Sequence, residues 1–87
     1  MINYLEQKGA ITVLMYLLEH EEGYIIELKK LENVGQAALY TALYNLQNLE
    51  LINEGRGTFN KRIFRLTNKG KKVALKLKEI EEILQEQ

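Results

Sequence analysis

The stretch from residue 34 to residue 52 constrains the fold of this chain more than any other segment. Its apolar side chains recur at i, i+3, i+4 and i+7, the spacing of one face of an α-helix: Leu39, Ala42, Leu43 and Leu46. The opposite face carries small, polar and aromatic side chains and no charge: Gln36, Ala37, Tyr40, Thr41, Tyr44, Asn45 and Asn48. Because a solvated helix face normally carries Lys and Glu, this uncharged face indicates a surface that binds a partner.

The chemistry of that face favours nucleic acid as the partner. Asn, Gln and Thr side chains match the hydrogen-bond donors and acceptors that base edges present in the major groove. The same face would also suit docking to another protein. We therefore pursue two hypotheses, a DNA-binding helix and a protein-interaction helix, and we favour the first.

The length of the chain, 87 residues, predicts one domain spanning residues 1–87. A domain of this size buries only about 60–65% of the surface of its unfolded chain, so pairing with a second copy would stabilise it. No apolar run approaches the ~20 residues that cross a bilayer, and no signal segment opens the chain. Together with the absence of cysteine, this predicts a cytoplasmic protein without a membrane partner.

The residue types that catalysis and metal binding require are scarce. The chain has no cysteine and no serine, and its only histidine is His20, which we expect to lie solvated at a helix end. A site with several histidine or thiolate ligands is therefore excluded, and no nucleophile is paired with a base. We expect neither enzymatic activity nor a metal or other cofactor.

Charge is balanced overall but unevenly distributed. The chain has 12 Lys and Arg residues and 12 acidic residues, so its net charge is zero. Residues 55–72, however, contain cationic side chains and no acidic one: Arg56, Lys61, Arg62, Arg65, Lys69, Lys71 and Lys72. A local field of that sign attracts phosphate groups even though the total charge vanishes.

The residues before the central stretch predict two further helices. Ala10–His20 is apolar over most of a helical circumference. Glu21, Glu22 and Gly23 would end this helix, with Gly23 supplying the turn. Tyr24–Ile25 would form a short strand and Ile26–Leu31 a short second helix. Asn33 tolerates a left-handed turn, and Gly35 would be the N-cap of the central helix. Two helices joined by so short a connection form a helix-turn-helix unit.

The residues after the central helix predict a β-hairpin and a long helix. Leu51–Gly55 and Arg62–Leu66 would pair as antiparallel strands around a glycine-rich, cationic tip, residues 55–61. Phe64 and Leu66 would lie on one face of the second strand and Ile63 and Arg65 on the other. Thr67 is a suitable N-cap for a helix that begins at Asn68.

The last helix carries an apolar seam spaced 4, 3 and 4 residues apart, which predicts pairing with a second copy: Val73, Leu77, Ile80 and Leu84. Helix Ala10–His20 has surplus apolar surface that would contribute to the same contact. The apolar segment Met1–Glu6 would pack on that helix or on the second copy. The alternative is that the seam packs back onto its own domain.

Two segments resemble the winged helix-turn-helix regulators of the MarR and PadR type. The segment from Leu39 to Leu43, with Leu46, Leu51 and Ile52 after it, is similar to the L-Y-x-A-L-x-x-L-x-x-x-G-L-I pattern of their DNA-binding helix. Residues 64–70, FRLTNKG, are similar to their F/Y-x-L-T-x-x-G pattern at the end of the wing. The resemblance covers roughly residues 10–78. Glu50 occupies the position at which that pattern has glycine; if the backbone there must be left-handed, glutamate costs on the order of 1 kcal/mol.

The resemblance implies a mainly α fold with a small β-hairpin (α+β), a winged helix-turn-helix of residues 8–66 followed by a C-terminal dimerisation helix, residues 67–87. Helix 35–49 would lie in the major groove of double-stranded DNA and wing 55–62 on the backbone or minor groove. A dimer would bind an inverted repeat. The predicted DNA contacts are Gln36, Ala37, Tyr40, Thr41, Tyr44, Asn45, Arg56, Lys61 and Arg62.

Two other functions stay open from the sequence. The first is a winged-helix module of transcription or replication machinery that binds protein and has no DNA specificity of its own. The second is a regulator with a small apolar effector held between the first and last helices, lined by Tyr4, Met15 and Tyr16.

Overall fold

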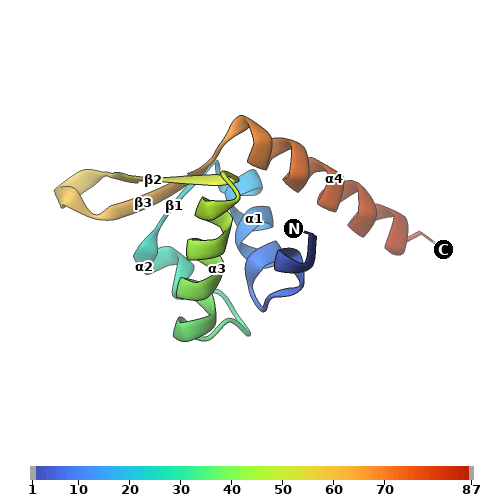
Figure 1. The fold of residues 1–87 in the computed structure, drawn as a ribbon, viewed down its shortest axis with the longest axis horizontal. Helices are drawn as coiled ribbons and strands as arrows, with labels where there is room; N and C mark the ends of the chain where they lie inside the picture. The colour runs from blue at the N-terminus through green and yellow to red at the C-terminus, as the bar shows by residue number, and fades with distance from the viewer. Residues whose placement is uncertain (1, 87) are drawn as a thin grey trace.

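The computed structural model describes residues 2–86 and contains four α-helices, a three-stranded sheet and two short 3-10 helices (Figure 1). Their order along the chain is η1 Ile2–Glu6, α1 Ala10–His20, β1 Glu22–Tyr24, α2 Ile25–Leu28, α3 Gln36–Asn48, β2 Ile52–Arg56, η2 Thr58–Asn60, β3 Arg62–Leu66 and α4 Asn68–Leu84. Met1 and Gln87, which the predicted N-terminal segment and C-terminal helix included, lie outside the described residues. The sequence-based prediction of a mainly α fold with a small sheet is confirmed.

The helix-turn-helix unit consists of α2, a connection and α3. Helix α2 is shorter than predicted: it begins at Ile25 and ends at Leu28, because the backbone then tightens into i→i+3 hydrogen bonds from Lys30 to Glu27 and from Leu31 to Leu28. Asn33 has a φ of 63°, as its tolerance of the left-handed region predicted. Gly35 is the N-cap of α3.

The strand before α2 also differs from the prediction, because it spans Glu22–Tyr24 instead of Tyr24–Ile25. The Glu27 carboxylate accepts a hydrogen bond from the Tyr24 amide at 2.8 Å, which fixes the start of the helix at Ile25. The turn after α1 lies at Glu21, whose φ is 72°, and not at Gly23. Gly23 is buried inside β1, where a Cβ would lie 3.0 Å from the Tyr16 ring.

The sheet has the order β1-β3-β2, and both pairs are antiparallel. β2 and β3 form the predicted hairpin, with Glu54 opposite Phe64 and Arg56 opposite Arg62. β1 pairs with the other edge of β3. Both Ile63 and Phe64 are buried although they lie on opposite faces of β3, so this strand is covered on both sides near its middle.

The core lies between α1, α3, α4 and the inner face of the sheet. All four residues of the predicted α3 stripe are fully or almost fully buried, as expected for a helix packed along one face. Val13, Leu14 and Leu17 of α1 and Phe64 of β3 meet this stripe. The hairpin and α4 project from the core toward opposite ends of the molecule (Figure 1), which is 46 Å long and about half as wide.

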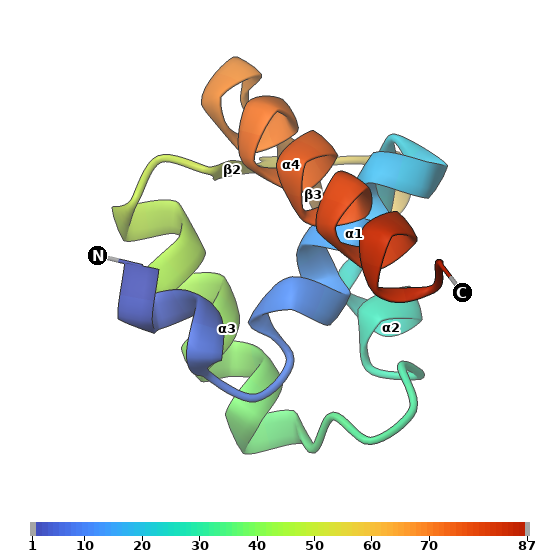
Figure 2. The same ribbon diagram turned by 90° about the vertical axis from the view of Figure 1, so that its right-hand side faces the viewer.

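Helix α4 begins as predicted, with the Thr67 hydroxyl accepting a hydrogen bond from the Gly70 amide. Gly70 lies against the chain at Leu51, where a Cβ would overlap the carbonyl oxygen. Helix α4 crosses α1 and extends beyond it (Figure 2). The apolar seam of α4 therefore becomes more exposed toward its C-terminal end: Val73 and Leu77 are half-buried, whereas Ile80 and Leu84 are 52% and 79% exposed.

An apolar groove of about 450 Å³ separates α4 from η1 and the end of α3. Its walls come from Ile2, Leu5, Leu49, Leu51, Val73, Leu77 and Ile80, with Lys69, Lys72 and Lys76 along one rim. The residues predicted to line an effector pocket do not meet here. Tyr16 stacks on His20 with a centroid separation of 4.1 Å, and Tyr4 is 39% exposed. No helix among residues 2–86 has the length and apolar character needed to cross a membrane.

Candidate nucleic-acid interface

Helix α3 presents the predicted uncharged face to solvent. Gln36, Ala37 and Thr41 are exposed, and Tyr44 is 68% exposed. Helical spacing places Ala37, Thr41 and Tyr44 directly opposite the buried stripe. These side chains hold no partner within the described part of the chain, so they are available to a ligand that lies along the helix.

Tyr40 lies on the flank of α3 that faces the hairpin. The Lys29 ammonium lies 5.9 Å from the centroid of its ring, and the Arg62 guanidinium carbon lies 6.0 Å from it. Cations at these distances interact favourably with the ring face. Tyr40 therefore links α3 to the residue that follows α2 and to β3. A role for Lys29 could not be predicted from the sequence, because nothing local links residue 29 to residue 40.

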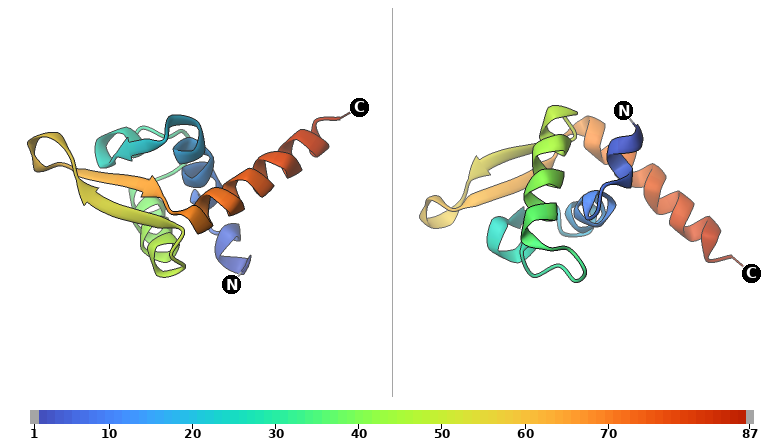
Figure 3. Two further views of the ribbon diagram at one scale, coloured as in Figure 1. Left: turned by 90° about the horizontal axis from the view of Figure 1, so that it is seen from above. Right: turned by 60° about the horizontal axis from the view of Figure 1, so that its bottom comes forward.

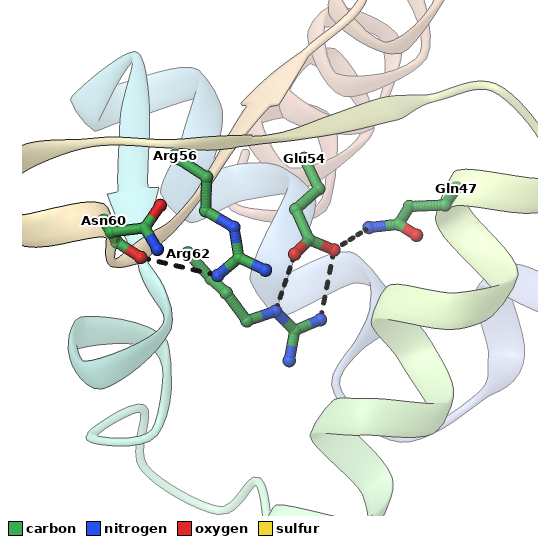
Figure 4. Close-up of polar contacts among 5 residues, drawn as sticks. All are labelled: Gln47, Glu54, Arg56, Asn60 and Arg62. Atoms are coloured by element: carbon green, nitrogen blue, oxygen red, sulfur yellow. Dashed lines mark hydrogen bonds and ion pairs between the residues drawn. The ribbon is translucent and has the colours of Figure 1, made fainter.

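Arg62 is held by a carboxylate (Figure 4). Its Nε donates to Glu54 Oε2 at 2.7 Å and its terminal nitrogen to Oε1 at 3.1 Å, while Gln47 of α3 donates to Oε1 at 3.2 Å. The Arg62 guanidinium holds the pKa of the Glu54 carboxyl below its usual range, and Glu54 in turn raises the pKa of Arg62. The bidentate pair joins the two strands of the hairpin, and the Gln47–Glu54 hydrogen bond ties the hairpin to α3.

This ion pair changes the predicted charge of the wing. Arg62 was predicted to contact DNA, but its side chain is 36% exposed and already paired with the Glu54 carboxylate. Arg65 is likewise paired, with Glu22 at 3.2 Å on the other face of the sheet, and Lys69 donates to the Leu49 carbonyl oxygen at 3.0 Å. The wing cations without a carboxylate partner in residues 2–86 are Arg56 and Lys61.

Arg56 points from β2 to the same side of the hairpin as Glu54 and Arg62 (Figure 4). Its guanidinium donates to the Asn60 carbonyl oxygen at 3.5 Å, a long contact that leaves most of its donors free. The alternation of a strand places residues 54 and 56 on one face, and the pairing of Arg56 with Arg62 adds the third. The arginines thus lie on the side of the hairpin that Gln47 and Tyr40 of α3 approach.

Asn45 is the predicted contact residue whose surroundings differ most from expectation. It is half-buried, and its amide nitrogen donates to the Gln7 side-chain oxygen. Figure 3 shows η1 beside the C-terminal part of α3, and Gln7 follows directly after η1. Asn45 therefore anchors the N-terminal segment to α3, a role that no local pattern in the sequence indicates.

Comparison with solved structures identifies the architecture. The sequence matches no protein-family model and no curated protein. ZitR of Lactococcus lactis, as an apo variant, superposes with a TM-score of 0.80 and 26% identity over 94% of this chain. The adhesin competence repressor AdcR of Streptococcus pyogenes gives 0.73 and 25% over 88%. A protein of Porphyromonas gingivalis assigned to the MarR family of transcriptional regulators gives 0.79 and 19% over 98%, with 85% of its own chain covered.

The fold is the winged helix-turn-helix of MarR-type regulators. This winged-helix chain spans 61% of the length of ZitR and 59% of AdcR. A protein of Archaeoglobus fulgidus has a similar fold over 98% of its own length, with a TM-score of 0.80 and 22% identity. ZitR, AdcR and the MarR-family protein of Porphyromonas gingivalis are transcriptional regulators and not enzymes. The family resemblance predicted from the two sequence motifs is confirmed at the level of the fold.

Proposed function

We propose that this protein is a cytoplasmic, sequence-specific regulator of transcription that binds double-stranded DNA through α3 and the wing. The observation that carries the proposal is the joining of an exposed, uncharged helix face to a cationic hairpin through the Gln47–Glu54 hydrogen bond and the Tyr40–Arg62 contact. A protein-docking helix has no need of the adjacent cations. The similarity to transcriptional regulators supports the same function.

In this proposal α3 lies in the major groove. Gln36, Thr41 and Tyr44 are exposed along its outer face and suit base edges or thymine methyl groups, with Ala37 allowing close approach. The N-terminal backbone amides of α3 have no side-chain cap, so they can donate to a phosphate. Tyr40 and Lys29 lie at the hairpin side, where they suit the sugar-phosphate backbone.

Arg56 and Lys61 on the wing would contact phosphates or enter the adjacent minor groove. Arg62 supports them by fixing the hairpin against α3, and it can reach a phosphate itself only by releasing Glu54. Asn45 acts indirectly, by holding the N-terminal segment beside the helix. The proposed contact set is therefore narrower than the one expected from the sequence.

We further propose that two copies pair through α4 and the groove beside it. The first half of α4 is basic and its second half mostly acidic, with Lys69, Lys72 and Lys76 on the groove rim and Glu79, Glu81 and Glu82 beyond. Antiparallel pairing of two such helices sets each basic half against an acidic one. It also covers Ile80 and Leu84 of both copies, and a two-fold dimer would bind an inverted repeat.

The test begins with selection of duplexes from a random DNA pool, followed by fluorescence anisotropy between ~50 and ~200 mM salt. Binding should weaken steeply with salt because phosphate contacts release counterions. Arg56→Ala and Lys61→Ala should weaken binding to all duplexes and flatten the salt slope. Lys78→Ala, an exposed lysine on α4, is the matched control and should change neither.

The base-contacting role of α3 needs its own readout. Gln36→Ala and Thr41→Ala should alter which sequences are selected, since each removes a hydrogen-bonding group from the outer face. Both residues are exposed, so the variants should keep the melting temperature of the parent protein. Selection of no duplex above background, with the protein folded, would refute the proposal and leave protein docking as the function of this face.

A further inference from the structure

The tip of the wing carries the most exposed large apolar side chain among those of residues 2–86. Phe59 is 88% exposed, more than any residue of the α4 seam. It lies in η2 at the end of the hairpin, as far from the core as the wing extends (Figure 1). Neither the core nor the groove beside α4 uses it.

The turn that carries Phe59 is held in place by hydrogen bonds. The Gly57 amide donates to the Lys61 carbonyl oxygen at 2.8 Å, and the Asn60 amide donates to Gly57 at 3.0 Å. The Thr58 amide donates to the Tyr24 hydroxyl at 3.0 Å, which ties the tip to β1. These hydrogen bonds hold the backbone on both sides of Phe59, so its direction is set by the fold.

The backbone of Phe59 is in an unfavourable conformation. Its φ of 59° and ψ of 30° lie in the left-handed region, which glycine and asparagine occupy readily and bulky residues rarely do. Asn60, the next residue, has the same φ. A bulky aromatic side chain at such a position adds strain, and Phe59 is 88% exposed and outside the core formed by residues 2–86, which points to a contact outside the chain.

The neighbours of Phe59 indicate the chemistry of that contact. Arg56 and Lys61 flank it, and residues 55–72 contain no carboxylate. A single ring between polar Thr58 and Asn60 is too small an apolar area for a protein interface, which needs about 800 Å² from each partner. A cationic finger with one apolar side chain at its end matches the minor-groove binders that insert an apolar wedge at a base step.

Resting on the DNA-binding function proposed above, we propose that Phe59 is a minor-groove wedge. While α3 occupies the major groove, the wing would reach the adjacent minor groove, where Arg56 and Lys61 contact phosphates and the Phe59 ring presses into one base step and partly unstacks it. Unstacking is easiest at pyrimidine–purine steps such as TA and CA/TG. Phe59 thereby adds a preference for particular base steps under the wing, without a hydrogen bond to the bases of that step.

Because the backbone at residue 59 is left-handed, the ring can be removed without adding backbone strain. Phe59→Asn removes the ring but suits the left-handed backbone, so this variant should fold and melt at or above the temperature of the parent protein. Phe59→Leu keeps an apolar wedge and is the conservative control. Both are assayed on a selected duplex carrying a TA step under the wing, and on the same duplex with that step replaced by AA.

The readouts are anisotropy and the fluorescence of 2-aminopurine placed at the step, which rises when the base unstacks. The parent protein and Phe59→Leu should raise the fluorescence, whereas Phe59→Asn should not. Phe59→Asn should bind the TA duplex about tenfold more weakly and lose the preference for TA over AA, with the salt slope unchanged.

Two outcomes separate the inference from the function on which it rests. Equal affinity and equal 2-aminopurine fluorescence for Phe59→Asn and the parent protein overturn the wedge while leaving DNA binding intact. Absence of duplex binding by the parent protein overturns both.

Discussion

Replacing Glu54 with Gln should strengthen DNA binding although it removes an ion pair. Glu54 is an anion on the face of the hairpin that would approach phosphates, and it occupies two donors of Arg62. The amide introduced by Glu54→Gln would keep the size of the side chain and its contact with Gln47. The substitution would release Arg62 to a phosphate and remove a repulsive charge.

The two effects differ in size and sign. The Arg62 and Glu54 side chains are 36% and 27% exposed, and pairs of this kind contribute about 0.2–1 kcal/mol, so unfolding should become easier by that amount. One additional phosphate contact should steepen the slope of log K against log salt by about 0.9. If the added contact contributes nothing at 1 M salt, this slope makes Glu54→Gln bind about eightfold more tightly than the parent protein at 0.1 M salt.

The assay is anisotropy over a salt series, with thermal melts recorded at pH 7. The pKa of Glu54 is lower in the folded protein than in the unfolded chain. The ionised carboxylate therefore stabilises the fold fully above the ordinary glutamate pKa, and this stabilisation is lost as the pH falls through the folded-state pKa. Glu22→Gln is the matched control, since it removes the Arg65 pair on the opposite face of the sheet and should leave DNA binding unchanged. Weaker binding by Glu54→Gln, or an unchanged salt slope, would refute this reasoning.

Three further predictions concern the fold and the dimer. Gly70→Ala should lower stability by about 3 kcal/mol in denaturant unfolding, because its Cβ would overlap the Leu51 carbonyl oxygen; a loss smaller than about 1 kcal/mol would contradict this packing. Glu50→Gly should be neutral or stabilising by up to about 1 kcal/mol, because Glu50 has a φ of 62°, and a lower melting temperature would count against it. Ile80→Glu with Leu84→Glu should yield a folded monomer in sedimentation, whereas an unchanged mass would exclude α4 as the interface.

Much of the fold could be predicted because it depends on local patterns. The apolar spacing of α3, the Thr67 cap and the strand Arg62–Leu66 all follow from residues within a few positions of one another. The bounds of α1 matched the prediction for the same reason. Glu50 has a φ of 62°, the left-handed conformation that the glycine of the family pattern raised as a possibility.

The candidate site could be predicted only in part, because its geometry depends on contacts between distant residues. The partner of Asn45 is 38 positions away, and Lys29 meets Tyr40 only after α2 and α3 pack. The neutralisation of Arg62 by Glu54 depends on the register of the hairpin, which composition does not specify. Counting cations along residues 55–72 therefore overestimated the free charge on the wing.

The central claim is that the outer face of α3 and the wing form one DNA-binding surface. The most direct measurement is a titration of ¹⁵N-labelled protein with a selected duplex, followed by amide chemical shifts. The largest changes are expected at Gln36, Thr41, Arg56 and Lys61, with residues of α4 little affected. Changes confined to α4 and η1, or an absence of changes in α3, would contradict it.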